Sequence, residues 1–95
     1  MENEITRVLV VDDEPDVVTF ISTVLNDNGY ETVTAKDGVE ALERVKERRP
    51  DLISLDITMP EKSGVRFYRD MRESDEYKDI PIVIVNIGLL IDSVR

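Results

Sequence analysis

The chain has 95 residues, of which 41% are hydrophobic, and its 21 Asp and Glu against 12 Lys and Arg give a formal net charge of −9. This size and hydrophobic content predict one small domain with a core of its own. Because Cys and His are both absent, disulfides, thiolate sites, histidine metal ligands and histidine acid–base chemistry are excluded.

The first half of the chain predicts two strands, each followed by a helix. An apolar run without alternation predicts a strand at about Thr6–Val11 that is covered on both faces. Proline and acidic residues then begin a helix at about Pro15–Asn28, whose apolar stripe is wide enough to pack on two neighbours. A short strand at Glu31–Ala35 and a helix near Val39–Arg48 follow. The narrower apolar stripe of this second helix is Val39, Ala41, Leu42 and Val45.

The second half repeats this alternation of strand and helix. Leu52–Asp56 predicts a strand, Met59–Gly64 a loop and Gly64–Arg72 a third helix. Pro81–Val85 predicts a fourth buried strand with proline at its entry, where a missing N–H matters least. Strands that alternate with helices indicate right-handed crossovers and a mostly parallel sheet with helices on both faces.

Acidic residues stand directly at the ends of two of the expected strands. Asp12 and Asp13 follow the first strand, and Asp56 ends the third. Ligands of such sheets bind beyond the carboxyl ends of the strands, so the three acids converge if these strands are neighbours. Carboxylates are costly to desolvate, and this placement indicates a divalent cation site. The alternative is that Asp12 and Asp13 cap the first helix.

Five motifs follow one another from the first expected strand to the fourth: Val8–Glu14, Asp37-Gly38, Pro50–Pro60, Ser63-Gly64 and Ile80–Val83. In these motifs the chain resembles a known family, the receiver domain of two-component response regulators. The resemblance implies a flavodoxin-like (CheY-like) doubly wound parallel sheet of strand order 2-1-3-4-5.

The resemblance also implies a function. Asp56 would accept a phosphoryl group from a phosphohistidine on a partner, either a sensor histidine kinase or a phosphotransfer protein. Mg²⁺ would be held by Asp12, Asp13, Asp56 and the backbone carbonyl of Thr58, offsetting the repulsion between carboxylate and phosphoryl group. Such a domain is no enzyme in the usual sense and catalyses at most its own phosphorylation and dephosphorylation. The hydroxyls of Thr58 and Ser63 are interpreted as ordinary turn-forming groups.

The sequence departs from the family at its C-terminal end. Asn86 stands where receivers have the Ser or Thr that contacts the phosphoryl group; its amide can still donate to phosphate, or it can cap a turn. No lysine follows Lys78 to pair with the phosphate. We therefore expect a receiver domain at 5–86 with strand order 2-1-3-4, a fifth strand and helix that are missing or replaced, and a divergent tail at 87–95. Self-association through the edge of the fourth strand or through the first helix is a further expectation.

Two other functions remain open on the sequence alone. One is a phosphorylation-independent interaction module, favoured by Asn86 and the missing lysine. The other is a Mg²⁺-dependent phosphatase or nuclease, which is disfavoured because the chain lacks the additional acid pair or DxD spacing of such enzymes. The acidic charge argues against direct contact with nucleic acid or membranes. No apolar run approaches the roughly 18 residues of a membrane span and the N-terminus has no signal-peptide pattern, so the expected location is cytoplasmic.

Overall fold

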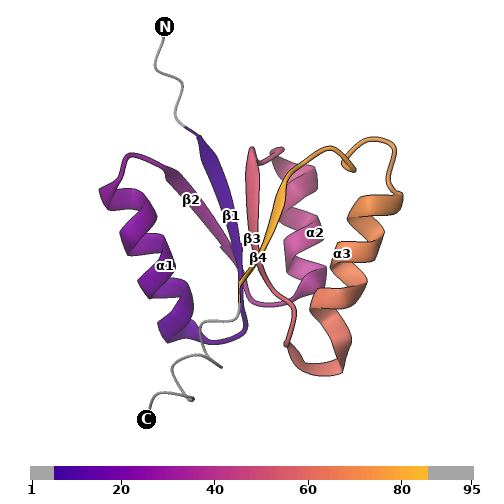
Figure 1. Ribbon diagram of the computed structural model, residues 1–95, viewed down its shortest axis with the longest axis horizontal. Coiled ribbons are helices and arrows are strands. Elements are labelled where there is room, and N and C mark those ends of the chain that lie inside the picture. The colour runs from indigo at the N-terminus through magenta and orange to yellow at the C-terminus, as the bar shows by residue number, and fades with distance from the viewer. Residues whose placement is uncertain (1–5, 86–95) are drawn as a thin grey trace, which may run out of the picture.

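Strands and helices alternate along the chain, and the strands form a single sheet with helices on both faces (Figure 1). The computed structural model describes residues 6–85. The elements are β1 (Arg7–Val11), α1 (Pro15–Asp27), β2 (Glu31–Ala35), α2 (Gly38–Glu47), β3 (Leu52–Asp56), the 3₁₀ turn η1 (Pro60–Lys62), α3 (Ser63–Glu73) and β4 (Ile82–Val85). Figure 1 shows α1 on one face of the sheet and α2 and α3 on the other.

The four strands are parallel and lie in the order β2-β1-β3-β4. This confirms the expected flavodoxin-like sheet and its strand order 2-1-3-4. In the register of the sheet, Val11 of β1 lies beside both Ala35 of β2 and Leu55 of β3. The carboxyl ends of β1, β2 and β3 therefore meet at one edge of the sheet, which we call the carboxyl edge.

The main core lies between the sheet and the pair α2 and α3. Alternate residues of β1 and β3 enter it, because neighbouring strand residues point to opposite faces. Its largest buried side chains are Leu9, Ile53, Leu55, Phe67, Met71 and Ile80. The other face is covered by α1, whose Val17 is buried while Phe20 and Val24 are 57% and 45% exposed. As its wide apolar stripe predicted, α1 has more apolar surface than the described residues cover.

One core prediction for α2 is wrong. Val39 is 73% exposed, whereas Ala41 and Val45 are buried. Val39 lies two positions before Ala41, about 200° around an α-helix, and so it faces away from the sheet. The apolar face of α2 is therefore narrower than the expected stripe.

The loop after β3 is more structured than expected. It contains the turn η1 and two residues with positive φ, Glu61 at 59° and Lys62 at 58°. Residues other than glycine rarely adopt this left-handed conformation. α3 also begins one residue earlier than expected, at Ser63.

Some expectations fall on the end of the chain. Asn86 and the tail at 87–95 lie outside the described residues, so the domain boundary between residues 86 and 87 stays a prediction. Within the part that the structure describes, no helix is both long and apolar enough to cross a membrane.

Candidate functional site

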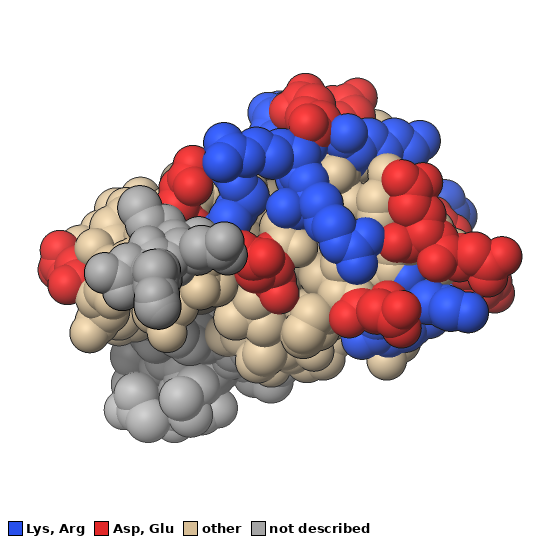
Figure 2. Space-filling view, turned by 90° about the horizontal axis from the view of Figure 1, so that it is seen from above, with Lys and Arg blue, Asp and Glu red and all other residues tan. Residues whose placement is uncertain are grey.

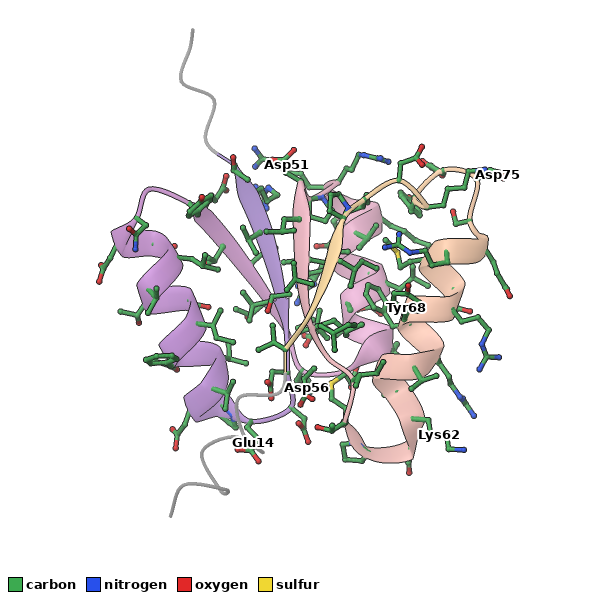
Figure 3. All side chains as sticks on the ribbon, viewed as in Figure 1. Glu14, Asp51, Asp56, Lys62, Tyr68 and Asp75 are labelled. Atoms are coloured by element: carbon green, nitrogen blue, oxygen red, sulfur yellow. The ribbon has the colours of Figure 1, made fainter. Side chains whose placement is uncertain are left out.

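Three carboxylates gather at the carboxyl edge of the sheet. Asp12 and Asp13 follow β1 and Asp56 ends β3, and one oxygen from each lies within 4.8 Å of the others. Asp12 and Asp56 are only 5% and 8% exposed, whereas Asp13 is exposed to solvent. Figure 3 shows Asp56 at this edge, on the same side of the molecule as Glu14. The structure thus brings together the three acids that the parallel sheet was expected to place in one pocket.

Asp12 is held by the backbone on both sides. Its N–H donates to the carbonyl of Ala35 at 3.1 Å, and its Oδ1 accepts from the N–H of Glu14 at 2.9 Å. Glu14 is the N-cap of α1 and makes no side-chain capping bond, so Asp12 shapes the turn into the helix without capping the first turn itself. The N-cap of α1 is Glu14 and not Asp12 or Asp13, so the capping alternative is wrong.

The pKa of Asp12 is raised from 3.8 to about 6. Burial is the largest cause, and the charges of Asp56 and Asp13 add to it, while the hydrogen bond from Glu14 acts in the opposite direction. Desolvation and like charges both disfavour a carboxylate. A bound cation would reverse this preference and favour the ionised form of Asp12.

Asp56 is oriented by the residue two positions after it. Its Oδ1 accepts from the Thr58 N–H at 2.9 Å and from the Thr58 hydroxyl at 2.6 Å. Both of these hydrogen bonds from Thr58 go to Oδ1 and fix that oxygen. The sequence interpretation of Thr58 missed this contact with Asp56, although an acid followed by Thr two residues later is a known turn signal.

Among residues 6–85, the three acids Asp12, Asp13 and Asp56 stand outside the ion pairs that the fold makes elsewhere. A hard divalent cation such as Mg²⁺ suits these groups, because it prefers oxygen ligands and binds through one or two carboxylates plus water. The donor set therefore fits the expected metal. The Thr58 carbonyl stays a predicted ligand.

A cavity of about 260 Å³ opens beside two of the acids. Its lining includes Asp12, Asp13, Thr19, Thr34 and Lys36. A larger cavity of about 780 Å³ lies between α2 and α3, and none of the three acids lines it. Of these two cavities, the smaller one adjoins the acid cluster, through Asp12 and Asp13.

A family model described as the response regulator receiver domain matches residues 8–88. One similar protein is the CAI-1 autoinducer sensor kinase/phosphatase CqsS of Vibrio cholerae, 44% identical over 81% of this chain and 11% of its own length. Another is the transcriptional regulatory protein PrrA of Mycobacterium tuberculosis, 42% identical over 90% of this chain and 36% of its own. The chain thus spans a minor part of both relatives.

A solved structure supports the same fold. The N-terminal domain of a response regulator receiver protein from Methanoculleus marisnigri superimposes with a TM-score of 0.83 at 34% identity. The match covers 87% of this chain and 68% of that one.

Proposed function

The chain belongs to the response regulator receiver domain family, and from this premise we propose that it accepts a phosphoryl group on Asp56 with the help of Mg²⁺. The donor would be a phosphohistidine on a sensor histidine kinase or a phosphotransfer protein. The family is a signalling family rather than an enzyme family. Beyond accepting the phosphoryl group, the domain would catalyse only its own dephosphorylation. A cytoplasmic location stays a prediction.

One observation carries this proposal. Oxygens of Asp12, Asp13 and Asp56 lie within 4.8 Å of one another, and two of these carboxylates are nearly buried. Burial and the neighbouring charges of Asp56 and Asp13 disfavour the ionised form of Asp12 unless a cation shares the site. The cluster is therefore better suited to a metal ion than to a role in the fold.

Each residue has a separate part in the proposed reaction. Mg²⁺ would neutralise charge between the carboxylate and the incoming phosphoryl group. Asp12 and Asp13 would hold the ion from β1, and the Thr58 carbonyl would add a ligand from the loop after β3. Thr58 also fixes one oxygen of Asp56 through its N–H and hydroxyl. The Oδ2 of Asp56 would then attack phosphorus, forming an O–P bond as the P–N bond to the donor histidine breaks.

Intact-mass analysis tests the proposal. We expect the protein to gain one phosphoryl group after incubation with acetyl phosphate and Mg²⁺. The same treatment should leave Asp56→Asn unmodified, and EDTA should prevent the gain on the parent protein. If the parent protein binds Mg²⁺ and yet forms no adduct, the result favours the second candidate function below over phosphoryl acceptance.

The second candidate function is a phosphorylation-independent interaction module, and a measurement of partner affinity tests it. This candidate is favoured by Asn86 at the position where the family has Ser or Thr. Such a module would bind its partner equally with and without the phosphoryl donor. A partner affinity that changes on phosphorylation would exclude it.

We also propose that the protein self-associates through β4. On this strand, Val83 and Ile84 are 50% and 46% exposed. Among the described strands only β3 pairs with β4, which leaves its outer backbone groups for another strand. An apolar, unpaired strand edge is a template for pairing with a second chain. Light scattering at tens of micromolar should show a dimer that Val83→Lys weakens, and a monodisperse monomer would refute this proposal.

A further inference from the structure

The start of α2 is linked to both loops that carry the acids, to one through the end of β2 and to the other through the start of α3. On one side, the Asp12 N–H donates to the carbonyl of Ala35 at 3.1 Å, at the end of β2. The next residue, Lys36, donates its N–H to Glu40 Oε1 at 2.8 Å. The chain segment beside Asp12 is therefore attached to α2.

On the other side, α2 is bonded to the start of α3. The Gly38 N–H donates to the hydroxyl of Ser63 at 2.6 Å, across 25 positions of sequence. A Cβ at Gly38 would lie 2.6 Å from the Ser63 carbonyl oxygen, so the two helix starts are in direct contact. Asp37 completes this turn by accepting from the Glu40 N–H at 2.8 Å.

The start of α3 in turn packs on the backbone of Asp56. A Cβ at Gly64 would lie 2.6 Å from the Asp56 carbonyl oxygen and 2.9 Å from the Cα of Ile57. The intervening loop includes Glu61 and Lys62, both with positive φ. Residues other than glycine keep such a conformation only where the surrounding structure holds it in place. Ser63 and Gly64 are the first residues after this strained pair, and both are anchored.

We propose that Ser63 is a positioning residue, whose hydroxyl fixes the loop of Asp56 against α2 and thereby sets its distance from Asp12 and Asp13. A turn-forming hydroxyl would bond within its own loop, whereas this one bonds a different helix. The inference rests on the proposed function only in that the positioned acids bind Mg²⁺.

The test compares two serines that make the same kind of bond. Ser74, just after the other end of α3, accepts from the Tyr77 N–H at 3.2 Å. We expect Ser63→Ala to weaken Mg²⁺ binding on the order of tenfold, as loss of a supporting residue does. Ser74→Ala should leave the affinity unchanged, and Ser63→Thr should restore it. Isothermal titration calorimetry with MgCl₂ measures all three variants against the parent protein.

Amide hydrogen exchange of the metal-free protein gives a second readout. In Ser63→Ala, the Gly38 and Thr58 amides should exchange faster, because both report on the joined loops, while Ser74→Ala should leave them unchanged. If Ser63→Ala does not fold, Ser63→Cys keeps the side-chain volume with a much weaker acceptor and replaces it.

The outcomes separate the two proposals. Parent-like Mg²⁺ affinity and parent-like Thr58 exchange in Ser63→Ala would overturn the positioning role and leave phosphoryl acceptance standing. A parent protein that binds no Mg²⁺ would overturn the proposed function, and the Thr58 exchange rate would still decide whether Ser63 holds the loop. An equal loss of affinity in Ser74→Ala would assign the effect to general stability and would also refute the inference.

Discussion

The two ends of the sheet differ in how their charged side chains are arranged. At the carboxyl edge, Asp12, Asp13 and Asp56 crowd together. At the opposite end, which we call the amino edge, acidic and basic groups alternate and pair (Figure 2). There Arg7 bonds Glu31 at 2.7 Å, and its backbone N–H donates to Asp51 at 2.9 Å. Figure 3 places Asp51 far from Asp56, at the other end of the strands.

The contrast indicates that the charged residues of the amino edge stabilise the fold, whereas those of the carboxyl edge are arranged to bind a ligand. Partly exposed ion pairs such as Arg7 with Glu31 stabilise a fold by at most about 1 kcal/mol. Crowded carboxylates destabilise it unless a cation is present. The amino edge should therefore respond to salt and the carboxyl edge to pH and Mg²⁺, and four substitutions test that division.

The largest effect should come from protonation of Asp12. Its pKa is raised from 3.8 to about 6, so between these values the folded protein binds more protons than the unfolded chain. Its contribution to stability is therefore complete below pH 3.8 and is lost as pH rises through about 6. The shift corresponds to a loss of up to about 3 kcal/mol. Urea unfolding in EDTA should show this fall for the parent protein and a smaller fall for Asp12→Asn. Identical pH profiles would contradict the expectation.

Gly64→Ala should have the next largest effect. The added methyl would lie 2.6 Å from the Asp56 carbonyl oxygen, and such overpacking costs about 2 kcal/mol. It should also weaken Mg²⁺ binding, because it displaces Asp56. Gly29→Ala is the control: Gly29 has φ of 92° with open space around it, so we expect a cost of about 1 kcal/mol and unchanged Mg²⁺ affinity. Urea unfolding and calorimetry measure both.

Asp13→Asn should affect binding more than folding. Asp13 is exposed at the rim of the cluster, so its removal relieves repulsion and leaves the core intact. We expect Mg²⁺ affinity to fall at least about tenfold, which is roughly 1.4 kcal/mol. Asp16→Asn, an acid in the first turn of α1 outside the cluster, is the matched control. Equal losses in both variants would point to general electrostatic attraction instead of ligation.

The smallest effect belongs to the amino edge. Glu31→Gln breaks the pair with Arg7 and should cost about 0.5 kcal/mol at low salt. The cost should shrink at 1 M NaCl, where the screening length is only about 3 Å. Mg²⁺ affinity should not change. A change in Mg²⁺ affinity on this substitution would contradict the separation of roles between the two edges.

The sequence was sufficient for the strands and their parallel arrangement, because apolar runs that end in acid are local signals. The strand order came from the family resemblance, and the meeting of the acids depended on that order. Val39 was misplaced because an apolar residue in the first turn of a helix need not lie on the buried face. Asp37 and Glu40 match a capping pattern that predicts the observed bond from the Glu40 N–H to the Asp37 side chain.

The contact of the Ser63 hydroxyl could not be predicted from the sequence, for a different reason. The partner of Ser63 is a backbone N–H on another helix, and only the packing of α2 on α3 brings the two together. The positive φ of Glu61 and Lys62 is likewise imposed by the anchors on either side, since neither residue favours it. Polar details that depend on tertiary contacts carry no periodic signal.

The direct pairing of β1 with β3 has a consequence for engineering. Val11 and Leu55 are neighbours in the sheet, so the separation of Asp12 and Asp56 depends on strand hydrogen bonds and not on the chain that connects them. A protein cut at the exposed turn around Gly29 should therefore reassemble from its two fragments with the acid cluster restored. The domain could serve as a split reporter, in which Mg²⁺ binding reports that the two pieces have met.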